Sequence, residues 1–137
     1  MTDGARISMA RYVGLFALIY IPLMILAAIV LNLIESKSSQ GANVGCLAAA
    51  SLGTAYLFVK KHRRPFLKGE YWTILAGSLA VDLLWQLVPA IPLFLAGKMT
   101  VAAYSIAVLF VGTLHGLFLA FMYSSRMVGK YVPKAAP

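Results

Sequence analysis

Apolar side chains follow one another in four long runs that are separated by short polar segments. The runs cover residues 12–34, 42–59, 71–96 and 101–123, and Asp82 is the one Asp, Glu, Lys or Arg within them. About 20 apolar residues in a helix cross the ~30 Å hydrocarbon core of a bilayer. A helix is the expected form because it pairs its own backbone amides where no water is present. The pattern predicts an all-α integral membrane fold, a bundle of four transmembrane helices in which sequential helices are antiparallel neighbours.

Composition favours the same class and excludes a water-soluble globule. Apolar residues make up 61% of the 137-residue chain and charged residues make up 12%, against roughly 25% charged residues in an average soluble domain. Too little polar surface is present to coat a protein in water. At this length we expect a single domain, residues 1–137.

Positive charge is distributed unevenly around the four predicted spans. Ten of the twelve Lys and Arg residues lie on the side that holds both termini and the segment between the second and third spans. The other two, Lys37 and Lys98, lie on the opposite side. Cytoplasmic segments of membrane proteins carry this kind of excess of Lys and Arg. We therefore expect both termini in the cytoplasm.

The segment between the second and third spans is the most basic part of the chain. Its cations are candidates for contact with anionic lipid headgroups, although the simpler explanation is that they only fix the topology. No nucleic-acid partner is expected, because the segment is short and lies against the membrane. The candidates for lipid contact are Lys60, Lys61, Arg63, Arg64 and Lys68.

Small residues recur at every fourth position in the second and fourth spans. Residues four apart lie on one helix face, and small residues let another backbone approach closely. Each stripe therefore predicts either packing inside the bundle or a seam between two copies of the chain. The stripes consist of Gly41, Gly45, Ala49 and Gly53 in the second span and of Gly112, Gly116 and Ala120 in the fourth.

Asp82 lies in the middle of the third run, where a charge is costly. A charged group at the centre of a bilayer costs at least about 2.5–3.5 kcal/mol, so Asp82 should face the interior of the bundle. Ser78 and Gln86 lie four residues to either side of Asp82 and therefore share its helix face. The third span thus presents three polar side chains in one row.

The other three spans each place a polar side chain at a similar depth. Tyr20, Ser51 and His115 come out roughly 12 Å from the edge of their spans, against roughly 16 Å for Asp82, at about 1.5 Å per residue. The six residues predict an intramembrane polar cluster. An Asp–His pair within it could exchange a proton, as a proton-coupled transporter requires. It is also what a structural hydrogen bond between helices looks like, and the sequence leaves both readings open.

Motifs for catalysis and for cofactor binding are missing from the sequence. It contains no phosphate-binding glycine loop, no dinucleotide-binding fingerprint and no G-x-S-x-G sequence. The single Cys46 excludes a disulfide within the chain and a zinc site made of cysteines. No second histidine lies three or four residues from His115. We expect no catalytic residue, no metal and no cofactor.

Residues 41–75, GANVGCLAAASLGTAYLFVKKHRRPFLKGEYWTIL, contain a glycine-rich span that ends in a basic stretch. The motif positions are Phe58, Val59, Arg63 or Arg64, Pro65 and Glu70. This segment resembles a family of small four-span bacterial inner-membrane proteins that has no established activity. The resemblance covers about the middle third of the chain. It implies four spans in a bacterial inner membrane and implies nothing about chemistry.

Two hypotheses about function follow. The first is a non-catalytic inner-membrane protein that binds another membrane component, either as an accessory subunit or as a partner that neutralises a toxin. The small-residue stripes and the near absence of mass outside the membrane favour it. The alternative is a dimeric proton-coupled exporter of a small molecule, with Asp82 as the proton carrier and with His115, Tyr20 and Trp85 around it. The expected partners are the lipid bilayer and either a second membrane protein or a second copy of the chain.

Overall fold

The computed structural model describes residues 7–35 and 40–133, and these residues form helices and no strand. Four helices are long and apolar enough to cross a membrane: α1 (Met9–Leu33), α2 (Gln40–His62), α3 (Lys68–Leu95) and α4 (Val101–Met122). A single turn of helix, α5 (Ser125–Val128), and a 3-10 turn, η1 (Gly129–Tyr131), follow them. The prediction of an all-helical chain with four long apolar spans is confirmed for the described residues.

The second span extends further than its apolar run. The prediction placed Lys60 and Lys61 in the segment between two spans, but α2 continues through them to His62. Lysine is a good helix former, and the helix dipole stabilises cations near a helix carboxyl terminus. The connection to α3 is therefore short, residues 63–67, and Arg63 within it adopts a φ of 52°.

The order in which the helices pack differs from the prediction in one respect. Helix α1 packs against α2 and α3, and α4 packs against the same two helices, so that α2 and α3 lie diagonally opposite each other. Antiparallel packing of sequential helices is found for α1 with α2 and for α3 with α4, but the expectation is wrong for α2 with α3. Five residues reach at most about 17 Å, and neighbouring helix axes are about 8–10 Å apart. The connection is therefore long enough to cross the diagonal of the bundle.

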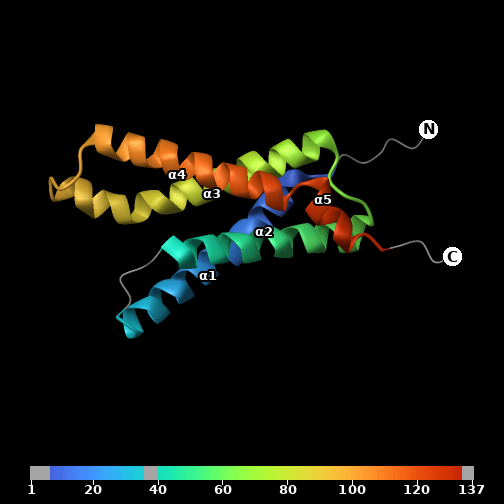
Figure 1. Cartoon of the computed structure of the whole chain (residues 1–137), viewed down its shortest axis with the longest axis horizontal. Helices are drawn as coiled ribbons and strands as arrows, with labels where there is room; N and C mark the ends of the chain where they lie inside the picture. The colour runs from blue at the N-terminus through green and yellow to red at the C-terminus, as the bar shows by residue number, and fades with distance from the viewer. Residues whose placement is uncertain (1–6, 36–39, 134–137) are drawn as a thin grey trace.

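All four helices come together at one end of the molecule, which we call the basic end (Figure 1). Helices α1 and α3 begin there, α2 and α4 end there, and α5 and η1 lie there against α2. Toward the opposite end, the α3–α4 pair separates from α1 and α2 (Figure 1). The described part of the chain is thus a bundle that is tightly packed over one half of its length and open over the other.

The buried core follows this shape, because most of it lies in the half of each helix near the basic end. Tyr12, Phe16 and Tyr20 are spaced four residues apart and form one buried face of α1. The rings of Phe16 and Tyr20 stack with their centroids 5.4 Å apart, and the ring of Tyr12 meets that of Phe58 edge-on at 5.1 Å. The other helices contribute Leu47, Ala50, Ala55 and Val59 of α2, Ile74 and Leu75 of α3, and Leu119 of α4.

The fourth-span stripe faces α3, and its two glycines line an open groove between α3 and α4. A Cβ atom added at Gly112 would meet Leu83 of α3 at 3.4 Å, and one added at Gly116 would meet Leu79 at 3.5 Å. Ala120, one turn further on, is partly buried, and its carbonyl accepts a hydrogen bond from the Tyr71 hydroxyl at 3.2 Å. This stripe therefore serves the packing of α4 against α3.

The second-span stripe is divided between the interior and the surface. A Cβ atom at Gly53 would meet Ile19 of α1 at 3.3 Å, so this end of the stripe packs inside the bundle. Gly41 and Gly45 have nothing within 4 Å of an added Cβ atom, and Ala49 is exposed. Three of the four positions thus form a flat outer surface on α2, near the open end of the bundle.

The most crowded of the described glycines lies outside both predicted stripes. A Cβ atom at Gly77 of α3 would lie 2.9 Å from Cγ1 and 3.2 Å from Cβ of Val13 on α1, and closer still to Cγ2. The valine side chain is branched at Cβ and has little freedom to move away. Gly77 is therefore the position that lets α1 and α3 pack directly against each other.

Replacing Gly77 with alanine should lower the free energy of unfolding by about 1–3 kcal/mol, because the added methyl group overpacks the α1–α3 contact. Gly14→Ala is the matched control, because its methyl group enters open space and should be neutral or slightly stabilising in a helix. Val13→Ala should restore most of the stability lost in Gly77→Ala. The measurement is reversible unfolding in mixed detergent micelles, and equal stability of Gly77→Ala and Gly14→Ala would contradict the close approach.

Candidate functional site

Asp82 lies near the middle of α3 with its side chain fully buried, and side chains of two other helices and of α3 itself converge on its carboxylate. The Tyr20 hydroxyl of α1 donates to Oδ1 at 2.6 Å. Nδ1 of His115, on α4, lies 2.6 Å from Oδ2, and Nε2 of Gln86 donates to the same oxygen at 3.0 Å. One carboxylate thus links α1, α3 and α4.

Helix α2 joins the same network through Asn43. The Oδ1 atom of Asn43 lies 2.7 Å from the Tyr20 hydroxyl, which also contacts Asp82. All four long helices therefore meet at one hydrogen-bonded group of side chains. We call this group, Tyr20, Asn43, Asp82, Gln86 and His115, the polar cluster.

The hydrogen atoms of the polar cluster can be arranged in two complete ways. Tyr20 has one hydroxyl hydrogen, so it donates either to Asp82 or to Asn43. When it donates to a charged Asp82, the Asn43 amide group has to turn its N–H toward the hydroxyl oxygen. When it donates to Asn43, its oxygen can accept a hydrogen bond from a protonated Asp82. Both arrangements leave no buried group of the cluster unpaired.

The contact between Gln86 and His115 follows from the acceptor that they share. Their Nε2 and Nδ1 atoms are 3.4 Å apart, and both lie within hydrogen-bonding distance of Oδ2 of Asp82. With a charged Asp82, both nitrogen atoms carry hydrogens that point at that oxygen. Donation by charged or neutral N–H groups to a carboxylate is stronger than a neutral hydrogen bond, which offsets part of the cost of burying the charge.

A pocket of about 440 Å³ opens beside the polar cluster, between α2, α3 and α4. Three of its lining residues, Asn43, Gln86 and His115, belong to the cluster, and the rest are apolar. A mostly apolar pocket with a few converging polar groups is the usual form of a small-molecule site. We call it the cluster pocket; its apolar lining consists of Val44, Phe110, Val111, Leu114 and Phe118.

Two of the six residues predicted for the cluster lie elsewhere. Ser78 is buried, but its hydroxyl pairs with that of Tyr123 at 2.9 Å, closer to the basic end than Asp82. Ser51 is buried and donates to the carbonyl of Ala48 on its own helix at 3.0 Å. A serine in a helix can always satisfy itself in this way, so its depth in a span does not require a partner on another helix.

Sequence reasoning did not place Asn43 in the cluster, because it assumed that the four spans begin and end at the same level. Asn43 contacts Tyr20, although it lies in the first turn of α2 while Tyr20 lies eleven residues into α1. The ends of the helices are therefore staggered. The available signal was chemical, because Asn43 is an amide side chain inside an otherwise apolar run.

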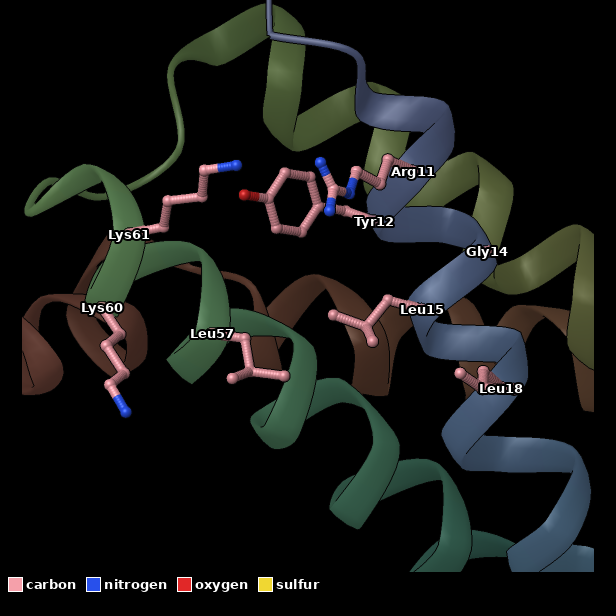
Figure 2. Close-up of a pocket in the computed structure, with 8 residues that line it drawn as sticks. All are labelled: Arg11, Tyr12, Gly14, Leu15, Leu18, Leu57, Lys60 and Lys61. Atoms are coloured by element: carbon pink, nitrogen blue, oxygen red, sulfur yellow. The ribbon is translucent and has the colours of Figure 1, made fainter.

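A second pocket, of about 590 Å³, lies between α1 and α2 at the basic end (Figure 2). It is separate from the polar cluster and shares no lining residue with the cluster pocket. Two of the five cations predicted to contact lipid, Lys60 and Lys61, line it together with Arg11, which the prediction did not include. We call it the basic-end pocket.

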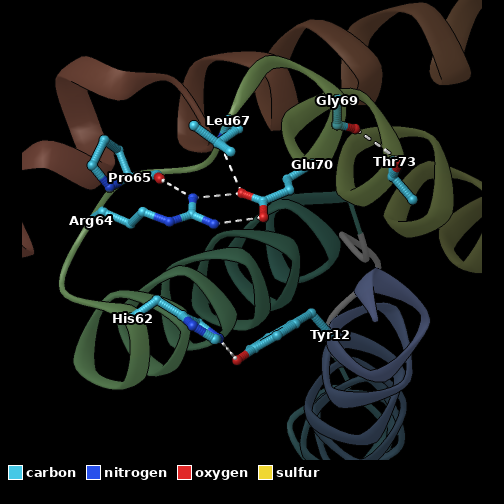
Figure 3. A network of polar contacts seen from close by, with 8 residues as sticks. All are labelled: Tyr12, His62, Arg64, Pro65, Leu67, Gly69, Glu70 and Thr73. Atoms are coloured by element: carbon cyan, nitrogen blue, oxygen red, sulfur yellow. Dashed lines mark hydrogen bonds and ion pairs between the residues drawn. The ribbon is translucent and has the colours of Figure 1, made fainter. Parts of the chain in front are cut away.

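Arg64 is held in a contact within the chain. Its guanidinium group makes two hydrogen bonds of 2.7 Å to the carboxylate of Glu70 (Figure 3), and it lies 5.4 Å from the centre of the Phe58 ring. The hydrogen bonds to Glu70 raise the pKa of Arg64 above its ordinary value. Glu70 also accepts the backbone N–H of Leu67 at 2.9 Å, which caps the start of α3. Arg64 thus fixes the α2–α3 connection.

The other two predicted cations, Arg63 and Lys68, are exposed and line neither pocket. Beside the Arg64–Glu70 pair, the Tyr12 hydroxyl and Nε2 of His62 form a hydrogen bond of 2.8 Å that joins α1 to α2 (Figure 3). Within residues 7–35 and 40–133, no three His, Cys, Asp or Glu side chains are grouped as a metal site.

Comparisons of this chain with protein-family models, with curated proteins and with solved structures found no match. The resemblance of residues 41–75 to a family of inner-membrane proteins therefore stays a prediction. The polar cluster and the two pockets are therefore the features of the structure that bear on function.

Proposed function

We propose that this chain is a multi-pass protein of the bacterial inner membrane, with both termini in the cytoplasm. The four long apolar helices support insertion into a membrane. The arrangement of charge supports the orientation, because Arg11, Lys60 and Lys61 all line one pocket at the basic end. The excess of Lys and Arg at this end is the one expected of a cytoplasmic face.

Its proposed role is to bind another membrane component without catalysing a reaction. The observation that carries this role is the outer surface of α2, where Gly41, Gly45 and Ala49 are uncovered directly beside the cluster pocket, which Asn43 and Val44 line. Lipid chains cannot hydrogen-bond to Asn43, Gln86 or His115 in that pocket. A transmembrane helix could approach closely over the small residues and place a polar side chain there.

The partner is either a second copy of this chain or another membrane protein. In the second case, this chain is an accessory subunit of that protein or neutralises it as a toxin. Both have the same chemistry at the contact: a helix with small residues on the facing side and at least one polar side chain. The short connections on either side of α3 support recognition within the membrane. Residues 63–67 and 96–100 are the only described connections between long helices.

A photoreactive diazirine residue at position 44, in place of Val44, should form a discrete protein adduct in intact membranes, while the same residue at position 84, in place of Leu84, should label only lipid. Both positions carry exposed apolar side chains on long helices, but only position 44 lies next to the stripe. The mass of the adduct distinguishes a second copy from another protein.

Ala49→Leu should largely abolish this adduct, because the larger side chain blocks close approach over the stripe. The matched change Ala80→Leu should leave the adduct unchanged. Lipid adducts alone from position 44, or equal protein adducts from both probe positions, would refute the proposed binding surface.

Proton-coupled export is the second candidate, and the polar cluster favours it specifically. Asp82 can gain or lose a proton while its partners stay hydrogen-bonded, and the cluster pocket lies against the same side chains. Phe110 and Phe118 in that pocket offer faces that attract an aromatic cation. Such a cation and a proton could compete for Asp82, which is the basis of exchange. The analogy with other small four-span exporters built around one embedded acid is only at the level of fold.

In proteoliposomes with an acidic lumen, export chemistry predicts accumulation of ethidium, because outward proton flow drives uptake of the cation. Asp82→Asn should abolish this uptake. The control Glu35→Gln removes an exposed carboxylate just after the end of α1 and should leave the uptake unchanged. Ethidium fluorescence measures the uptake. Uptake that persists in Asp82→Asn would eliminate Asp82 as the proton carrier.

A further inference from the structure

The basic-end pocket combines two kinds of lining in one groove between α1 and α2. Its lower wall is apolar and consists of Leu15, Leu18 and Leu57. The ends of the Arg11 and Lys61 side chains lie on either side of the Tyr12 ring above these leucines, and Lys60 points away from Tyr12 (Figure 2). The pocket thus has a cationic end and an apolar end, which is the complement of an amphiphile with an anionic head.

The described part of the chain supplies no carboxylate to these three cations. Glu70 is paired with Arg64, and Asp82 is hydrogen-bonded to Tyr20, Gln86 and His115, so both of these acids are already in use. Glu35 lies just after the end of α1, opposite the basic end. Asp3, the only other acid of the sequence, lies outside the described residues. Arg11, Lys60 and Lys61 thus have no carboxylate partner among the described residues, and an anionic ligand fits beside them.

The apolar part of the groove runs in the direction that a lipid chain would take. Leu18 lies seven residues after Arg11, a rise of about 10 Å along α1, against about 15 Å for one leaflet of the hydrocarbon core. Gly14 lines the groove between them and has nothing within 4 Å of an added Cβ atom. The groove is therefore open along its length, and Leu18 is 70% exposed.

We propose that the basic-end pocket binds an anionic phospholipid, with its phosphate beside the Tyr12 hydroxyl and within reach of Arg11 and Lys61, and with the start of one acyl chain along Leu15, Leu18 and Leu57. The guanidinium group of Arg11 offers a planar pair of donors to phosphate oxygens. Lys61 adds a second positive charge, and Lys60 adds a third at the rim. The Tyr12 hydroxyl can donate to the phosphate when Nε2 of His62 carries the hydrogen of their mutual bond.

The site selects against a zwitterionic headgroup. Phosphatidylethanolamine carries an ammonium group beside its phosphate, and the residues that line the pocket include three cations and no acid to pair with it. A phosphatidylglycerol headgroup has no such cation. The assignment of this lipid to the cytoplasmic leaflet rests on the proposed topology, but the preference for an anionic headgroup does not.

Native mass spectrometry of the full chain in detergent tests the proposal, with dioleoylphosphatidylglycerol and dioleoylphosphatidylethanolamine as probes. The wild-type chain should retain the phosphatidylglycerol preferentially. Arg11→Gln with Lys61→Gln should weaken its binding by about fivefold for each cation removed. The matched control, Arg63→Gln with Lys68→Gln, removes the same two charges from exposed positions outside the pocket and should leave binding unchanged.

A second variant distinguishes a lipid from a free phosphate. Gly14→Phe fills the apolar groove and leaves every charge in place, so it should lower phosphatidylglycerol binding while any weak binding of inorganic phosphate, measured by 31P NMR, stays the same. Equal retention of the two lipids would overturn the proposal, as would equal losses in the two charge variants. Unchanged phosphatidylglycerol binding by Gly14→Phe would reduce the site to a headgroup site and overturn the acyl-chain assignment.

Discussion

A single carboxylate buried among four apolar helices is the constraint on which this structure depends. Asp82 has no access to water, so its oxygens have to be paired within the protein. The partners come from separate helices: Tyr20 from α1 and His115 from α4, with Asn43 of α2 joined through Tyr20. Because each bond fixes the height and rotation of a different helix, the cluster sets the register of the bundle. The aromatic face of α1 and the close contact at Gly77 then complete the packing toward the basic end.

The two pockets on either side of this packed region differ in chemistry and therefore in proposed use. The cluster pocket is apolar with three neutral or titratable groups and lies toward the open half of the bundle. The basic-end pocket has three cations over a wall of leucines. Helix α2 contributes to both, through Asn43 and Val44 near its start and through Leu57, Lys60 and Lys61 near its end. A lipid bound at one end of α2 would therefore support the helix whose other end carries the proposed partner surface.

The sequence was sufficient to predict the features that follow from the separation of apolar and polar side chains. Long apolar runs predict spanning helices, and Asp82, Gln86, Tyr20 and His115 could be grouped because polar side chains avoid lipid. Features set by helix stagger and by packing order were not predictable in this way: Asn43 joins the cluster, Ser78 and Ser51 do not, and α2 lies diagonal to α3. Charge counting found the basic segment, but it could not tell that Arg64 is paired with Glu70 while Arg11 faces a pocket. Those distinctions need the positions of neighbouring helices.

A double-mutant cycle on unfolding in bicelles tests most directly whether the Asp82 network holds the four helices together. If Tyr20 donates to Asp82 across the α1–α3 contact, Tyr20→Phe and Asp82→Leu, each of which removes this hydrogen bond, should be coupled by about 0.5–2 kcal/mol, the range of hydrogen bonds between membrane helices. Tyr123→Phe is the matched control, because Tyr123 is also buried but pairs with Ser78, and it should combine with Asp82→Leu additively to within about 0.5 kcal/mol. A coupling free energy of zero for Tyr20, or the same value for Tyr123, would contradict the central role of this carboxylate.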